Sequence, residues 1–225
     1  MTRYNRSPFP PLYRQPAPSM ETSWFTGNPS PGLFLDRDGT INVEVDYLRR
    51  PDQLKLLPGA ARGIAQANRL KIPVIVVTNQ SGIARGYLTE DDLAEIHATL
   101  DQMLAAEGAH IDAYLYCPHH VEAKVPAYRM DCSCRKPRAG LLFAAAALHG
   151  IDVQKSYLIG DKRSDLVAAR SVGCTDILTR TGYGQTTEAT WPETSRPPWH
   201  TANNLEEAVW RVMADLGLER ERKVA

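Results

Sequence analysis

Short apolar runs of strand length alternate with longer segments of helical periodicity from Gly32 to near the end of the chain. This alternation is typical of a parallel sheet covered by helices on both faces. We therefore predict a Rossmann-like, three-layer α/β/α fold with a mostly parallel sheet. The strands are expected at residues 33–35, 72–77, 111–116, 156–159 and 175–178.

The segments between these runs carry helix signals. Pro58 is expected in the first turn of a helix that buries apolar residues over 60–70. Thr89 and Asp92 have the spacing of a capping box, which predicts that a helix begins between them. Further helices are expected over 140–149 with Gly150 as its end, over a segment that ends at Gly173, and over a last segment with Leu205, Val209, Val212 and Leu216 on one face.

The charge balance limits the partners of the chain. Its 225 residues contain 26 Lys and Arg and 26 Asp and Glu, so the formal net charge is zero. No overall positive field is present to hold nucleic acid or an anionic membrane. No apolar run approaches the roughly 18 residues of a membrane span. We expect a monomeric cytoplasmic protein without nucleic-acid or membrane partners, in which any anion is bound by a local site.

The two ends of the chain differ in composition from the rest. Residues 1–30 are rich in proline and lack periodic apolar positions, so we predict a mobile tail, with a proline-rich docking segment as the alternative. Residues 31–217 are expected to form a single domain. Residues 218–225 form a short charged end.

Polar residues follow three of the predicted strands directly. Asp36-Arg-Asp-Gly-Thr40 ends the first, Thr78-Asn-Gln-Ser-Gly82 the second and Gly160-Asp-Lys162 a later one. In a parallel sheet these strand ends meet at one edge, where ligands bind. Each fragment alone is also a common turn or cap. Together they gather carboxylates that would repel one another without a cation, and an oxygen-rich site of this kind suits Mg²⁺.

The motif Asp36-x-Asp-Gly-Thr40 resembles the first motif of the haloacid dehalogenase superfamily. Five blocks in order resemble, more closely, the D-glycero-D-manno-heptose-1,7-bisphosphate 7-phosphatases, and the resemblance spans roughly residues 31–217. It implies a haloacid dehalogenase fold and a phosphatase of nucleotide-activated heptose biosynthesis, for lipopolysaccharide core or surface glycan. The blocks are Phe34-Leu-Asp-Arg-Asp-Gly-Thr-Ile-Asn42, Val76-Val-Thr-Asn-Gln-Ser-Gly-Ile-Ala-Arg-Gly86, Cys117-Pro-His-His120, Cys132-Ser-Cys-Arg-Lys-Pro137 and Gly160-Asp-Lys162.

A phosphate ester resists hydrolysis because its dianion repels an attacking oxygen. Asp36 is expected to attack phosphorus and form an aspartyl-phosphate, while Asp38 donates a proton to the leaving alcohol and later activates water. Asp36, the backbone carbonyl of Asp38, and Asp161 are expected to hold Mg²⁺. Thr78 and Lys136 are expected to bind the phosphoryl oxygens.

Two further residues near Asp161 are assigned different roles. The family resemblance gives Lys162 a role as a phosphate ligand. Asp165 is expected to act as a supporting carboxylate at the start of a helix and not as a metal ligand.

A second metal site is expected over residues 117–134. Cys117, His119, Cys132 and Cys134 offer three thiolates and one imidazole, a complete set for a structural tetrahedral Zn²⁺. His119 is taken from the family pattern, and His120 is the alternative ligand. The loop between these residues has few large apolar side chains, so zinc is expected to order it and to hold the following Arg135 and Lys136 over the active site.

No large cap domain is expected, because the segments after the first motif and after Thr78 are short. The family substrate, a sugar bisphosphate, then has to be recognised by short loops and by a guanidinium suited to a distal phosphate. A histidinol-phosphate phosphatase and a non-catalytic phosphate-binding zinc scaffold remain the alternatives. The expected substrate contacts are Glu44, Val45, Asp46, Tyr47, Asn79, Gln80, Ser81, Arg135 and Lys162.

Overall fold

A seven-stranded sheet organises the chain in the computed structural model, which describes residues 13–14 and 29–218. The strand order is β1-β4-β3-β2-β5-β6-β7, and all neighbours are parallel except the pair β1 and β4. The three-layer α/β/α fold with a mostly parallel sheet is thereby confirmed. The strands are β1 (Tyr13–Arg14), β2 (Leu33–Leu35), β3 (Val74–Asn79), β4 (Ala113–Cys117), β5 (Tyr157–Gly160), β6 (Thr175–Thr179) and β7 (His200–Ala202).

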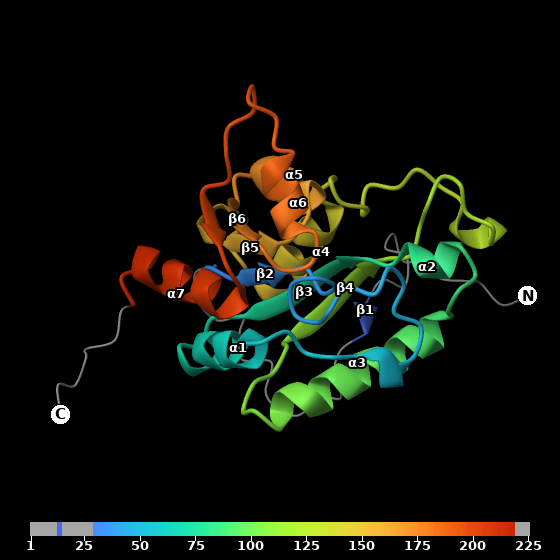
Figure 1. Ribbon diagram of the computed structural model, residues 1–225, viewed down its shortest axis with the longest axis horizontal. Coiled ribbons are helices and arrows are strands. Elements are labelled where there is room, and N and C mark those ends of the chain that lie inside the picture. Colours follow the sequence, from blue (N-terminus) through green and yellow to red (C-terminus); the bar gives the residue numbers. More distant parts are fainter. Residues whose placement is uncertain (1–12, 15–28, 219–225) are drawn as a thin grey trace, which may run out of the picture.

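Helices cover both faces of this sheet (Figure 1). Leu33 and Leu35 point into the core beneath one helix layer, whereas Phe34 between them packs on the other side, as strand alternation requires. The first layer consists of α1 (Ala60–Arg69), α3 (Glu90–Ala105) and α7 (Leu205–Asp215), and the second contains α4 (Gly140–His149) and α5 (Arg163–Arg170). The short helices α2 (Ser81–Ala84) and α6 (Gly184–Ala189) lie at strand ends.

Most predicted elements are present with small shifts of their ends. β2 and α4 have the predicted bounds, and the other predicted strands differ at their ends by two residues or fewer. The capping box is confirmed, because the Thr89 side chain accepts from the Asp92 backbone and Asp92 accepts from the Thr89 backbone. The first-turn position of Pro58 was wrong. Gly59, with φ of 84°, is the N-cap of α1, so Pro58 precedes the helix.

The segment between β6 and α7 contains α6 and β7. A buried carboxylate holds it in place: Asp176 of β6 pairs with Arg170 at 2.6 Å and with Arg196 at 3.3 Å. Arg170 also donates to the backbone carbonyls of Arg196 and Pro197. This segment is therefore held by the ion pair between Arg196 and Asp176 of β6, and β7 adds to the sheet beside β6.

No cap domain interrupts the described residues. Between β2 and α1 the chain forms loops and one short 3-10 turn, η2 (Pro51–Gln53), and between β3 and β4 it forms only α2 and α3. Within the described ranges, none of the helices is both long and apolar enough to cross a bilayer. The predicted mobile tail falls mostly on residues outside the described ranges, and its two residues in β1 extend the sheet at β4. The charged end also lies outside them, apart from Leu218.

Candidate active site and metal centres

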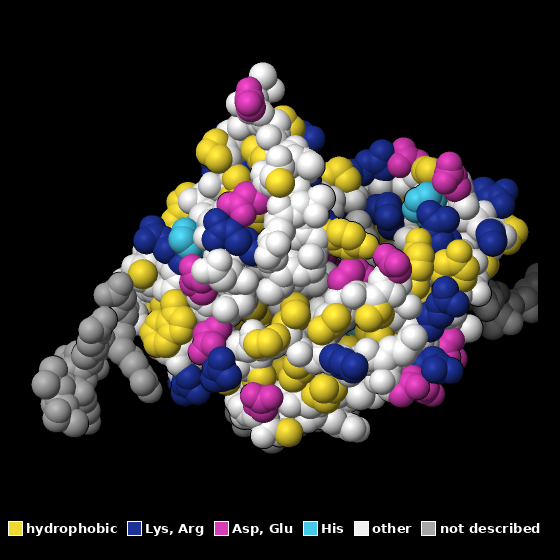
Figure 2. Space-filling model, viewed as in Figure 1, with side chains coloured by type: hydrophobic (Ala, Val, Ile, Leu, Met, Phe, Trp, Pro, Cys, Tyr) yellow, Lys and Arg dark blue, Asp and Glu magenta, His cyan; other side chains and the backbone are white. Residues whose placement is uncertain are grey.

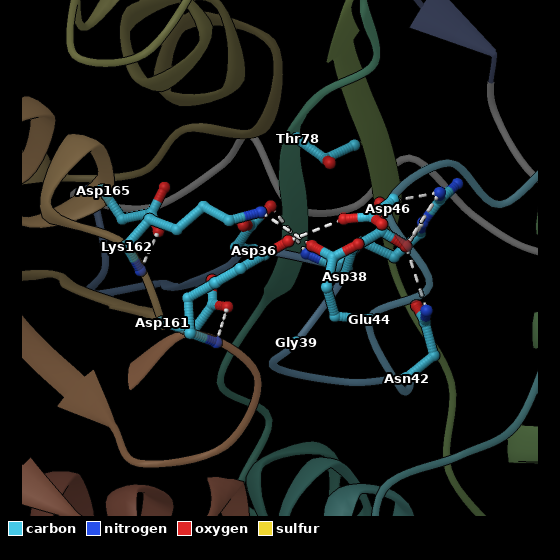
Figure 3. Close-up of polar contacts among 12 residues, drawn as sticks. Asp36, Asp38, Gly39, Asn42, Glu44, Asp46, Thr78, Asp161, Lys162 and Asp165 are labelled. Atoms are coloured by element: carbon cyan, nitrogen blue, oxygen red, sulfur yellow. Dashed lines mark hydrogen bonds and ion pairs between the residues drawn. The ribbon is translucent and has the colours of Figure 1, made fainter. Parts of the chain in front are cut away.

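The strand order reverses at β2, which pairs with β3 along one edge and with β5 along the other. Such a switch point creates a crevice beyond the carboxyl ends of the strands. Asp36 follows β2 there, and Asp161 follows β5. With Asp165 from the first turn of α5 they form a buried cluster whose nearest carboxylate oxygens lie within 4.8 Å of one another. Figure 3 shows these carboxylates turned toward a shared space.

Asp161 is fully buried beside a second carboxylate, so its negative charge is costly. Burial and the neighbouring Asp36 raise its pKa to about 8, and its Oδ1 atom has no hydrogen-bond partner. Its other oxygen accepts from the Tyr183 backbone N–H at 2.8 Å. A side chain at Gly39, whose φ is 83°, would meet that oxygen at 2.2 Å, so glycine is required for this close approach. The unpaired oxygen and the raised pKa both indicate a position for a cation.

Lys136 supplies the protein's own positive charge to the cluster. Its Nζ lies 2.7 Å from Asp165 Oδ1 and 3.0 Å from Asp36 Oδ1, and it donates to the Val77 carbonyl at 2.6 Å. Burial alone would lower the pKa of Lys136, but Asp165 and Asp36 outweigh it and raise the pKa. Asn79 fixes the backbone of Lys136 from both sides, since its amide donates to the carbonyl and accepts from the N–H.

Asp38 is held apart from the carboxylate cluster by hydrogen bonds. The Arg37 guanidinium donates to both oxygens of Asp38 at 2.8 to 3.1 Å, and the amides of Asn42 and Gln80 donate to one oxygen each. Burial would raise the pKa of Asp38, but the Arg37 charge and these hydrogen bonds lower it to about 2. Gln80 also donates to the Thr78 hydroxyl at 2.9 Å. Thr78 and Asp38 are thereby joined through one amide.

A cavity of about 300 Å³ opens beside Asp38. Lys162 lies on one wall, paired with Glu44 at 2.8 Å and 4.8 Å from the centre of the Tyr183 ring. Arg135 also lines the cavity, and its Nη1 donates to the His119 carbonyl. In Figure 2, Lys and Arg side chains gather over the segment between β4 and α4, which carries Arg135. The lining includes Glu44, Asp46, Tyr47, Asn79, Gln80, Ser81, Arg135, Lys136 and Lys162.

Four metal-binding side chains meet at the end of β4. The Cys134 Sγ lies 3.3 Å from Cys132 Sγ and 3.4 Å from His119 Nδ1, and Cys117 Sγ lies 3.5 Å from Cys132 Sγ and 3.7 Å from His119 Nδ1. Tetrahedral zinc with bonds of about 2.1 to 2.3 Å implies ligand separations of about 3.4 to 3.8 Å. His120 lies outside the set, and its Nδ1 accepts from the Glu122 backbone. His119 is therefore the better candidate ligand.

The comparisons with known proteins agree on one family. The D-glycero-beta-D-manno-heptose-1,7-bisphosphate 7-phosphatase of Escherichia coli (strain K12) is 41% identical over 161 residues, which are 71% of this chain and 84% of that protein. The enzyme of the same name from Rhodopseudomonas palustris is 42% identical over 143 residues, 64% of this chain and 79% of that protein. The chain belongs to this phosphatase family. A HAD-hydrolase-like family model also matches residues 133–208.

Solved structures support the same membership. The crystal structure of D,D-heptose 1.7-bisphosphate phosphatase from B. bronchiseptica, complexed with magnesium and phosphate, superposes with a TM-score of 0.71 at 32% identity and covers 82% of this chain and 99% of that one. A putative HAD-like phosphatase from Mesorhizobium loti gives a TM-score of 0.73 at 34% identity, over 88% of this chain and 91% of that one. The family confirms the predicted haloacid dehalogenase fold and makes the chain a phosphoric monoester hydrolase.

Both donor sets suit the metals that were expected from the sequence. Asp36 and Asp161 offer hard carboxylate oxygens, one of them unpaired and buried, as Mg²⁺ prefers. Asp165 has one oxygen on Lys136 and the other on the Lys162 backbone N–H, which agrees with a supporting role. The Cys117, His119, Cys132 and Cys134 set is closed by four protein ligands, which suits structural zinc.

The structure brings together most residues that the sequence singled out. Of the expected substrate contacts, Val45 is outside the cavity lining, and Asn79 lines it while its amide binds the Lys136 backbone. Arg37 and His97 were not predicted from the sequence, although both are buried and Arg37 contacts both Asp38 and His97. The position of Arg37 between two aspartates in the sequence could have indicated that it pairs with one of them. Nothing in the sequence pattern marked His97, which lies on a helix one layer away.

Proposed function

We propose that the chain is a Mg²⁺-dependent phosphatase that removes the 7-phosphate of D-glycero-D-manno-heptose 1,7-bisphosphate. The observation that carries the proposal is the buried group of Asp36, Asp161 and Lys136 at the switch point of the sheet, beside a cavity that Asp38 lines. The relatives are named for the β anomer, and we propose the same preference here. Such an enzyme acts in the supply of nucleotide-activated heptose.

Asp36 has the geometry of a nucleophile. Its Oδ1 is occupied by Lys136 and by the Arg37 backbone N–H, so Oδ2 is the oxygen left to attack phosphorus. Asp38 lies at the cavity and is ionised in the free protein. It would take a proton from the phosphate group of the bound substrate, pass that proton to the leaving alcohol, and then accept one from the attacking water. Mg²⁺, when bound by Asp36, Asp161 and the Asp38 carbonyl, would withdraw charge from the phosphoryl oxygens. Lys136 and the Thr78 hydroxyl would bind the same group.

A bisphosphate fits the charges of the cavity better than a cationic substrate does. Glu44 is neutralised by Lys162, and Asp46 accepts a hydrogen bond from the Tyr183 hydroxyl at 2.8 Å. Arg135 donates to a backbone carbonyl, which is an uncharged partner, so its positive charge is available for a distal phosphate. This balance favours a second anion over the amine of histidinol phosphate, the main competing substrate.

The proposal is tested by turnover of the purified full-length chain on the α and β anomers of the heptose bisphosphate and on histidinol phosphate, with and without Mg²⁺. We expect Mg²⁺-dependent release of the 7-phosphate, identified by NMR of the product, and no activity of the Asp36→Asn variant. A higher kcat/KM on histidinol phosphate would refute the substrate assignment. Unchanged phosphate release by Asp36→Asn would refute the nucleophile.

Zinc is proposed to act through position and not through chemistry. Cys134 directly precedes Arg135 and Lys136, so a metal that fixes Cys134 also fixes both cations at the cavity. Protein contacts also help to hold the cysteine loop, because the Lys124 and Val125 backbone N–H groups donate to the Ala84 carbonyl. Removal of zinc is therefore expected to lower turnover although no ligand touches substrate.

A further inference from the structure

Arg37 is the largest fully buried side chain of the described residues and stands between the two candidate catalytic aspartates. Its Nε and Nη2 donate to Asp38, which uses one edge of the guanidinium. Its Nη1 lies 3.2 Å from His97 Nε2 on the other side. An arginine stays charged and can only donate, so each of these partners has to accept. The orientation of the guanidinium is therefore set by Asp38 and His97 together.

His97 comes from α3, in the helix layer on the far side of the guanidinium from Asp38, and is 7% exposed. Its ring stacks on Tyr114 of β4 with centroids 4.2 Å apart and planes inclined by 16°. Because Arg37 only donates, Nε2 accepts and the ring proton resides on Nδ1. Burial and the Arg37 charge hold the pKa of His97 well below its usual range, so the ring is neutral at neutral pH.

We propose that His97 is a positioning residue for proton transfer: by accepting from Arg37 Nη1 it fixes the guanidinium plane, which aims the Asp38 carboxylate at the leaving-group oxygen. The proposal rests on the proposed phosphatase function. Asp38 is ionised in the free protein, so it first takes a proton from the phosphate group of the bound substrate. In the first step the Asp36–phosphorus bond forms, the ester P–O bond breaks and Asp38 passes this proton to the departing alkoxide. In the second step Asp38 takes a proton from water as the water oxygen replaces Asp36 on phosphorus.

Packing alone does not explain a histidine at this position. A buried apolar side chain would also fill the space, but it would leave an N–H of a fully buried guanidinium without an acceptor. The Tyr114 stack holds the imidazole plane, and the Tyr114 hydroxyl donates to Asp101 at 2.6 Å. A series of contacts therefore runs from α3 and β4 through Arg37 to Asp38, and it fixes a side chain that has to meet a substrate atom.

The test compares His97→Phe, which keeps an aromatic ring on Tyr114 but removes the acceptor, with Tyr114→Phe, a matched control that removes a hydroxyl from the same stack. The readout is kcat/KM on the heptose bisphosphate divided by kcat/KM on p-nitrophenyl phosphate. Both constants report the steps up to departure of the leaving group. p-Nitrophenolate leaves without a proton, whereas a sugar alkoxide has to be protonated as it leaves. We expect this ratio to fall about tenfold in His97→Phe, to recover partly in His97→Gln, and to stay unchanged in Tyr114→Phe.

Equal losses on the two substrates, or a ratio that does not move, would overturn the proposal. Crystal structures of the wild type and His97→Phe supply a readout that needs no activity. A shift of Arg37 and Asp38 in the variant is expected, and unchanged positions of both side chains would also overturn it. A wild-type protein inactive on the heptose bisphosphate would contradict the proposed function only. The ratio would then be measured with a simple alkyl phosphate in place of the sugar.

Discussion

Replacement of Lys136 by methionine tests whether the carboxylate cluster needs a fixed positive charge. The Lys136 ammonium contacts Asp165 at 2.7 Å and Asp36 at 3.0 Å and donates to the Val77 carbonyl, with a side chain only 1% exposed. Methionine keeps the length of the side chain but removes the charge and three hydrogen bonds. It leaves three carboxylates gathered without the ammonium that contacts two of them.

The expected cost follows from these contacts. Breaking a buried ion pair by removal of one partner costs about 3–5 kcal/mol, and the lost hydrogen bond to Val77 adds about 1 kcal/mol. We therefore expect Lys136→Met to lower the free energy of unfolding, measured by urea denaturation in Mg²⁺-free buffer, by about 4–6 kcal/mol. Saturating Mg²⁺ should restore part of this loss, because it supplies positive charge to Asp36 and Asp161.

Lys162→Met is the matched control for this variant. Its ammonium pairs with Glu44 at 2.8 Å, but its side chain is 39% exposed, so the loss of unfolding free energy should stay below about 1 kcal/mol. Equal effects of the two substitutions, or a Lys136→Met variant as stable as the wild type, would refute the argument that burial makes Lys136 the counter-charge of the cluster. Absence of any Mg²⁺ rescue would refute the assignment of the same cluster to a divalent cation.

Three further predictions use the same geometry. The pKa of Asp161 is raised from 3.8 to about 8, so between these pH values the folded state binds more protons than the unfolded state. The free energy of unfolding, measured with urea in Mg²⁺-free buffer, should therefore fall as the pH rises from about 4 to 8. An unfolding free energy that does not change over this range would contradict the prediction. Cys132→Ser should lower the zinc content, the kcat and, by several kcal/mol, the free energy of unfolding, since the metal contributes on the order of 10 kcal/mol in zinc peptides. Full activity without zinc would exclude a positioning role for the metal. Arg135→Ala should raise KM for the bisphosphate about tenfold and leave KM for a heptose monophosphate within about twofold, and equal increases would remove its assignment to the distal phosphate.

The sequence located the reactive groups because they follow buried strands. The apolar runs identify β2, β3 and β5, and a parallel sheet places their carboxyl ends at one edge, so the convergence of Asp36, Thr78 and Asp161 is predictable from chain order alone. The cysteine cluster was equally accessible, because the spacing of Cys117, His119, Cys132 and Cys134 matches one tetrahedral ion. Signals of this kind are local, and they depend on one element at a time.

Contacts that join separate layers could not be predicted in this way. The packing of α3 against the sheet brings His97 to Arg37, and a residue pair 60 positions apart has no spacing rule. Asn79 illustrates the same limit. Its place after the predicted strand at 72–77 indicated a substrate contact, but in the fold its amide is occupied by the backbone of Lys136, 57 positions further along. Polar side chains at a strand end can bind either a ligand or another loop, and tertiary structure decides between them.

A phosphatase without a cap has to fix its cations by other means, and Lys136 shows how this chain does so. Its backbone is held by Asn79 from β3 and its ammonium by Asp36 and Asp165, and Cys134, two positions before it, belongs to the four-residue metal set. These restraints come from β3, from the strand ends and from the cysteine loop, so no single one determines the position of Nζ. We therefore expect Asn79→Ala and Cys132→Ser to be more than additive in their loss of kcat when combined, because each leaves the other as the main restraint on the Lys136 backbone. Strict additivity of the two losses, measured as a double-mutant cycle in kcat, would mean that the amide and the metal act on separate parts of the site.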